Sequence, residues 1–171
     1  MTVKKTPNSE PTEGQKKQLY NLYKAIYHSK LDNKRNKLMT YLFAWEDWSW
    51  RIEGISKGAL QILKEKKFYP KPKGLLVRHH HKQNRATTYE EMLKKEMSFE
   101  HWWSYFWEND VTYLITKTEH DDINSIKLLD KDIVKINWTD GYFKGGGLVG
   151  FKYLKSIEAV YVKQLCDDNN I

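Results

Sequence analysis

Three consecutive histidines, His79, His80 and His81, are the densest group of side chains in the sequence that can do chemistry. A neutral imidazole is a common metal ligand, and histidine is the commonest general base in proteins. The short apolar run after a Pro/Gly break predicts a strand over residues 74–82. Because successive side chains of a strand point to opposite faces, His79 and His81 share one face and His80 lies on the other.

A fourth histidine, His120, is followed four residues later by Asn124. The sequence from Thr116 predicts a helix that ends near Leu129, and residues four apart share a helix face. Asp121 is turned away from that face and is a weaker ligand candidate. A strand histidine and the helix His/Asn pair can hold one divalent ion between them. Imidazole and oxygen ligands without a thiolate suit magnesium, manganese, nickel or zinc.

The segments LLVRHHHK (75–82) and ENDVTYLITKTEHDDIN (108–124) resemble the two ends of the motif of the HNH, or ββα-metal, endonucleases. That motif has a His-His or Asp-His pair on a first strand, an asparagine near a second strand, and a closing His or Asn on the next helix. The resemblance covers residues 76–126 and implies a metal-dependent endonuclease. Residues 83–108 are then a helical insertion, and Asn109 takes the place of the middle asparagine, two residues before its usual position.

The resemblance also implies a role for each histidine. One member of the triplet activates water, which we assign to His80, and its neighbour His79 binds the metal together with His120. Asn124 joins the metal ligands through its place on the helix. A register shifted by one residue, with His81 as the base and His80 as a ligand, fits nearly as well.

Positive charge is concentrated in the first part of the chain. Residues 1–73 contain 16 basic and 7 acidic residues, whereas the remainder contains 13 and 15, which gives the formal net charge of +7. Such an asymmetry is typical of a surface that binds a polyanion, and nucleic acid is the first candidate because phosphate neutralisation releases counterions. Beside the triplet, Arg78, Lys82 and Arg85 are candidates to clamp flanking phosphates. We expect DNA as the substrate.

Composition excludes several other classes of protein. A single cysteine excludes an internal disulfide framework and a cysteine-rich zinc site. No apolar run is long enough for a transmembrane helix, and the first residues lack the apolar core of a secretory signal. We therefore expect a cytoplasmic protein with no membrane partner.

Together these patterns predict an α+β fold. We expect an N-terminal helical region, then the strand–helical insertion–strand–helix unit, and a C-terminal β-hairpin around Gly145-Gly146-Gly147. The expected divisions within one compact domain are a flexible tail (1–11), a basic helical region (12–69), the HNH-like unit (74–130) and a C-terminal part (131–171). Expected helices begin near residues 12, 33, 56, 87, 98 and 116, and expected strands cover 74–82, 111–116 and 132–138.

Two other functions compete with the endonuclease hypothesis. The first is a non-catalytic basic protein that binds nucleic acid through a helix-turn-helix-like pair over residues 33–66, with IEGISKG (52–58) as its turn. The second is a protein–protein adaptor of the phage or mobile-element type that uses a tryptophan-rich surface. Loss of divalent-dependent cleavage on substitution of His80 or His120 distinguishes the endonuclease from both.

Overall fold

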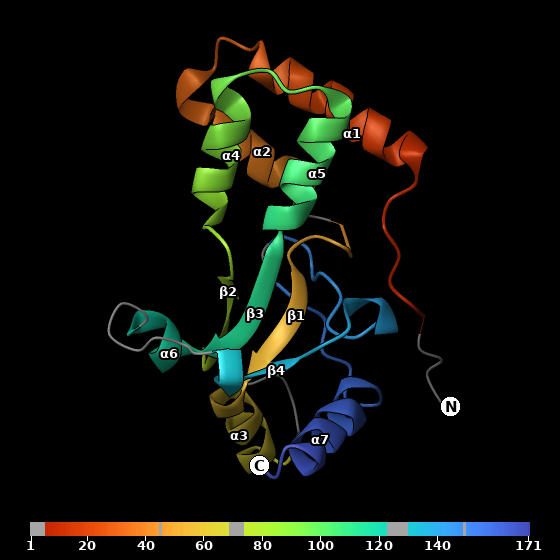
Figure 1. Ribbon diagram of the computed structural model, residues 1–171, viewed down its shortest axis with the longest axis vertical. Coiled ribbons are helices and arrows are strands. Elements are labelled where there is room, and N and C mark those ends of the chain that lie inside the picture. Colours follow the sequence, from red (N-terminus) through yellow and green to blue (C-terminus); the bar gives the residue numbers. More distant parts are fainter. Residues whose placement is uncertain (1–5, 45, 69–73, 123–129, 149) are drawn as a thin grey trace.

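The computed structural model describes residues 6–44, 46–68, 74–122, 130–148 and 150–171. Within these ranges the fold is α+β, a four-stranded sheet with helices around it. Figure 1 shows α1, α2, α4 and α5 grouped beyond one end of the strands, and α3 and α7 beyond the other. The main elements are α1 (Glu13–Tyr27), α2 (Arg35–Phe43), β1 (Arg51–Ser56), α3 (Lys57–Glu65), β2 (Leu76–His80), α4 (Arg85–Lys94), α5 (Phe99–Asn109), β3 (Val111–Thr116), α6 (Lys117–Asp121), β4 (Ile133–Lys135) and α7 (Glu158–Asp168).

The sheet has the strand order β2-β3-β1-β4. Strands β1 and β3 are parallel, whereas β2 pairs with β3 and β4 pairs with β1 in the antiparallel direction. The interpretation of residues 52–58 as a turn was wrong, because residues 51–56 form the inner strand β1. Gly54 allows this close packing: a Cβ there would lie 2.6 Å from Ile133 Cγ2 and 2.8 Å from Tyr113 Cδ1.

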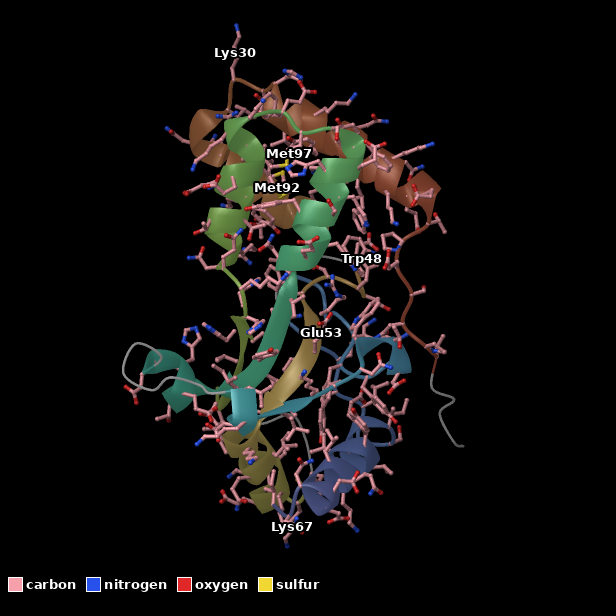
Figure 2. The ribbon with its side chains drawn as sticks, in the orientation of Figure 1. Lys30, Trp48, Glu53, Lys67, Met92 and Met97 are labelled. Carbon is pink, nitrogen blue, oxygen red and sulfur yellow. The ribbon has the colours of Figure 1, made fainter. Side chains whose placement is uncertain are left out.

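The helical insertion predicted between the two histidine-bearing segments is confirmed as α4 and α5. These helices pack with α1 and α2 around a buried aromatic cluster, in which the rings of Phe43 and Phe106 stack 3.9 Å apart. Met92 lies inside this group and Trp48 at its edge (Figure 2). The tryptophans of this cluster are core residues, namely Trp48, Trp102, Trp103 and Trp138.

The N-terminal helices follow the sequence pattern with one correction. The capping box of Thr12 and Gln15 begins α1, and Ser56 caps α3, as predicted. Helix α2 ends at Phe43 rather than continuing toward Trp50, because the buried indoles of the following segment pack as a turn and not as a helix face. Trp50 has a positive φ of 53°, a conformation that is incompatible with a helix.

Among the described residues the predicted C-terminal hairpin is short: an antiparallel bridge joins Gly145 and Phe151, and the N–H groups of Gly146 and Lys152 donate to the carbonyls of Gly150 and Lys144. Gly145 N–H donates to the Asp47 carbonyl, so the hairpin is also bonded to the turn after α2. Strand β4 is shorter than the predicted 132–138, and the chain ends with α7. The helix predicted to reach Leu129 is described only as α6, since residues 123–129 lie outside the described ranges.

A second buried cluster lies between the sheet and helices α3 and α7 and contains Ile52, Ile55, Leu60, Leu114 and Val162. Strand β1 connects the two clusters. It belongs to the expected basic helical region, yet it pairs with β3 of the HNH-like unit and with β4 of the C-terminal part. No helix within the described ranges is both long and apolar enough to cross a lipid bilayer.

Candidate active site on the β2–β3–α6 unit

Two of the predicted site histidines meet on one face of the β2–β3–α6 unit. His79 pairs with Tyr113 in the antiparallel ladder, and β3 continues into α6, which carries His120. The ring centroids of His79 and His120 are 5.7 Å apart, with the ring planes 77° apart. This distance allows both imidazoles to contact one small ion or one reacting group between them.

The first turn of α6 is fixed by Glu119. Its Oε2 accepts from the Thr116 N–H at 2.7 Å in a capping box and from the Ser56 hydroxyl at 2.7 Å. Gly58 leaves the space that this carboxylate needs, because a Cβ there would lie 2.7 Å from Glu119 Oε1. The ends of the parallel strands β1 and β3 are therefore tied together immediately beside His120.

His81 lies on the same face as His79. Its backbone N–H donates to the Val111 carbonyl at 3.1 Å, which extends the ladder and its alternation by one residue. Its exposed ring packs against Tyr113, with centroids 4.4 Å apart. Burial lowers the pKa of His79, and the neighbouring His120 and His81 lower it further, which keeps the His79 imidazole neutral and its lone pair available. We refer to His79, His81 and His120 as the histidine face.

His80, the residue assigned as the base, lies on the opposite face of β2. Its ring contacts the edge of Trp50, with centroids 5.8 Å apart. Burial, and then the charges of Arg85 and Arg78, lower the pKa of His80 to about 4. Its Nδ1 is buried and has no hydrogen-bond partner among the described residues. The structure therefore separates His80 from the histidine face, because a strand directs neighbouring side chains in opposite directions.

Two of the predicted phosphate clamps lie with His80. Arg78 Nη1 donates to the Trp50 carbonyl at 2.8 Å, and the Arg85 guanidinium lies 4.5 Å from the centre of the Trp50 ring. Both arginines line a cavity of about 490 Å³, which we call the arginine pocket. Trp50, Arg78, His80, Asn84, Arg85 and Gly150 are among the residues that line it.

The remaining predicted site residues lie elsewhere. Asn109 is the last residue of α5, and its side-chain Nδ2 donates to the Tyr105 carbonyl at 2.8 Å. Lys82 is exposed and, with His81, lines a separate hollow. Asn124 lies outside the described residues.

Asp110 is a buried group that our sequence reasoning missed. It follows α5 and accepts a hydrogen bond from the Trp50 N–H at 2.7 Å. Burial raises its pKa to about 7, against the opposing effects of that hydrogen bond and of Arg51, Arg78 and Arg85. Its position directly before a predicted strand gave no signal, because its partner Trp50 is distant in sequence.

The histidine face offers two protein ligands for a divalent ion. In the described part of the chain, no three His, Cys, Asp or Glu side chains gather closely enough to hold a metal ion. The Nδ1 of His120 lies 3.5 Å from an oxygen of Asp121, which is the outer-sphere contact that often orients a metal-binding imidazole and leaves its Nε2 free. His79 and His120 therefore fit an ion whose other ligands are water and substrate oxygens.

No family model matches the chain, and no curated protein or solved structure matches it significantly.

Proposed function

We propose that the protein is a metal-dependent endonuclease that hydrolyses phosphodiester bonds of nucleic acid, with DNA as its substrate. One observation carries the proposal: the rings of His79 and His120 lie 5.7 Å apart on a strand–helical insertion–strand–helix unit, with His81 on the same face. The formal charge of +7, with its excess in residues 1–73, supports a polyanionic substrate.

Each histidine has one task in this proposal. His79 and His120 would hold the divalent ion, and a bound ion would supply Lewis-acid stabilisation of the negative charge on the phosphate and on the leaving oxygen. His81 accepts the proton of the attacking water. The water oxygen bonds to phosphorus while the bond from phosphorus to the 3′ oxygen breaks. His81 takes the place first given to His80, because it shares the face of His79.

A plasmid-nicking assay with magnesium, manganese, nickel or zinc tests this proposal. We expect nicking that EDTA abolishes. His79→Ala and His120→Ala should each reduce the nicking rate about 100-fold or more, since losing a residue that merely hydrogen-bonds to a metal ligand already lowers metal affinity or activity about 10- to 100-fold. Zinc binding measured by calorimetry should weaken in the same two variants. His101→Ala, an exposed histidine on α5, is the matched control and should nick like the wild type.

Nicking that persists in EDTA, or that both alanine variants retain, contradicts the proposal. Absence of nicking with all four metals contradicts it as well. Of the two competing hypotheses, the helix-turn-helix-like pair does not form as expected, because residues 51–56 form β1. For the adaptor, Trp48, Trp102, Trp103 and Trp138 are buried in the aromatic cluster, whereas Trp107 is partly exposed.

A further inference from the structure

The arginine pocket lies on the face of β2 away from the histidine face and has the chemistry of an anion site. Arg78 is held at its wall by the bond to the Trp50 carbonyl, and Arg85 lies over the Trp50 ring. The carboxyl group of Asp110, whose charge acts on both arginines, is buried and accepts a hydrogen bond from the Trp50 N–H. Two arginines therefore line one cavity, and guanidinium groups favour phosphate.

Two further features of the pocket add hydrogen-bond donors. Helix α4 begins at Arg85, so the N–H groups of Arg85 and Ala86 have no acceptor within the helix, and both residues line the pocket. His80 also lines it, and its Nδ1 is buried without a partner among the described residues. Arginines, helix amides and an imidazole thus meet at one cavity.

A second hollow of about 330 Å³ adjoins the arginine pocket and shares Arg85 and Ala86 with it. We call it the tyrosine hollow. Tyr41 of α2 lines this hollow and has 46% of its surface exposed. The hollow is also lined by Asn36, Lys37, Thr40 and Leu148. An exposed aromatic ring beside an amide and a lysine suits a heteroaromatic base, which stacks on the ring and hydrogen-bonds at its edge.

We propose that the arginine pocket and the tyrosine hollow together bind one nucleotide of a single-stranded nucleic acid, with its phosphate between Arg78 and Arg85 and its base against Tyr41. The choice of nucleic acid as the ligand rests on the proposed function, but the site does not include the histidine face. The phosphate is either a terminal monoester or a backbone diester. A base inside a duplex is stacked on its neighbours and cannot reach the tyrosine hollow.

Fluorescence anisotropy of short DNA oligonucleotides in EDTA tests this site, because without a divalent ion binding is measured apart from cleavage. Arg85→Gln should weaken binding of single-stranded DNA about tenfold or more. Tyr41→Ala should weaken it about fivefold or more, whereas Tyr41→Phe should retain wild-type affinity. Lys94→Gln removes the same charge at the far end of α4 and is the matched control, with little effect expected. Circular dichroism confirms that each variant is folded.

Two versions of the oligonucleotide, with and without a 5′ phosphate, distinguish a terminal phosphate from a backbone phosphate as the group bound. Tighter binding of the 5′-phosphorylated strand than of the 5′-hydroxyl strand identifies a terminal phosphate, and equal binding identifies a backbone phosphate. Binding that Arg85→Gln and Lys94→Gln weaken equally overturns the site, as does equal affinity for single-stranded and duplex DNA. Neither result changes the outcome of the nicking assay, so the nucleotide-binding site and the endonuclease activity are tested independently.

Discussion

At the scale of single residues, three identical neighbours are placed in three different environments. His79 meets His120, His81 lies exposed on Tyr113, and His80 is enclosed by Trp50 and two arginines on the other face. Their chemistry differs because the strand alternates and because burial lowers the pKa of His80 to about 4. The role of each histidine therefore depends less on its residue type than on which face of β2 its side chain occupies.

The division of roles between His81 and His80 predicts different kinetic defects. His81→Ala should lower kcat of metal-dependent cleavage about 100-fold or more, because it removes the proposed general base, and should leave zinc affinity largely intact. His80→Ala should act on KM, because it alters the arginine pocket. Steady-state cleavage of a labelled oligonucleotide measures both constants. A larger loss of kcat in His80→Ala than in His81→Ala would return the base role to His80.

Asp110 predicts a pH-dependent stability. Its pKa is raised from the ordinary 3.8 to about 7 in the folded protein, so the folded state favours the protonated form. This contribution is fully present below pH 4 and is lost as the pH rises toward about 7. Relative to Asp110→Asn, whose amide oxygen can still accept from Trp50 N–H, the wild type should lose a few kcal/mol over this interval.

Urea unfolding of both proteins at several pH values measures this difference. Asp168→Asn, an exposed acid on α7, is the control and should follow the wild type. If the free energy of unfolding changes with pH in the same way for the wild type and Asp110→Asn, Asp110 stays ionised between pH 4 and about 7.

At the scale of elements, the sequence predicted those whose boundaries are local. The capping boxes at Thr12 and Thr116 and the serine cap at Ser56 each begin a helix where expected, because the cap and its partner lie three residues apart. Strand β1 was missed because Gly54 and Ser56 are typical of turns. Gly54 is needed where β1 packs between the side chains of β3 and β4, and that requirement is not visible in a local pattern.

Glu119 predicts a link between a helix cap and catalysis. Glu119→Ala removes the acceptor for Thr116 N–H and for the Ser56 hydroxyl, and should lower the free energy of unfolding by about 1 kcal/mol or more. Because α6 is short and carries His120, the same change should weaken zinc binding. Glu119→Gln retains a capping oxygen and should restore most of both properties. Calorimetry and urea unfolding measure them, and unchanged zinc affinity in Glu119→Ala would contradict the link.

At the scale of the whole molecule, the basic excess predicts salt-dependent binding. The logarithm of the affinity for single-stranded DNA in EDTA should fall linearly with the logarithm of the salt concentration, because bound phosphates release counterions. Arg85→Gln should reduce the slope by about one, since it removes one phosphate contact. Anisotropy titrations at several salt concentrations measure this slope. A slope near zero in the wild type would show that charge does not drive binding.

The two candidate sites differ in how far the sequence could predict them. The meeting of His79 and His120 was foreseeable, because a strand, an insertion and a strand followed by a helix form one supersecondary unit. The arginine pocket was not, because Trp50, Arg85 and Gly150 come together only through the tertiary fold. Arg78 on β2 and Arg85 on α4 were expected beside the triplet, yet their meeting around Trp50 depends on the tertiary fold.

The pairing of β2 with β3 has a consequence for how the protein folds. The residues between these strands contain α4 and α5, so the hairpin closes a long loop that becomes less costly in entropy once the two helices have packed together. The aromatic cluster should consequently form early and the histidine pair late. A nascent chain then keeps His79 and His120 apart until β3 and α6 have been synthesised and packed.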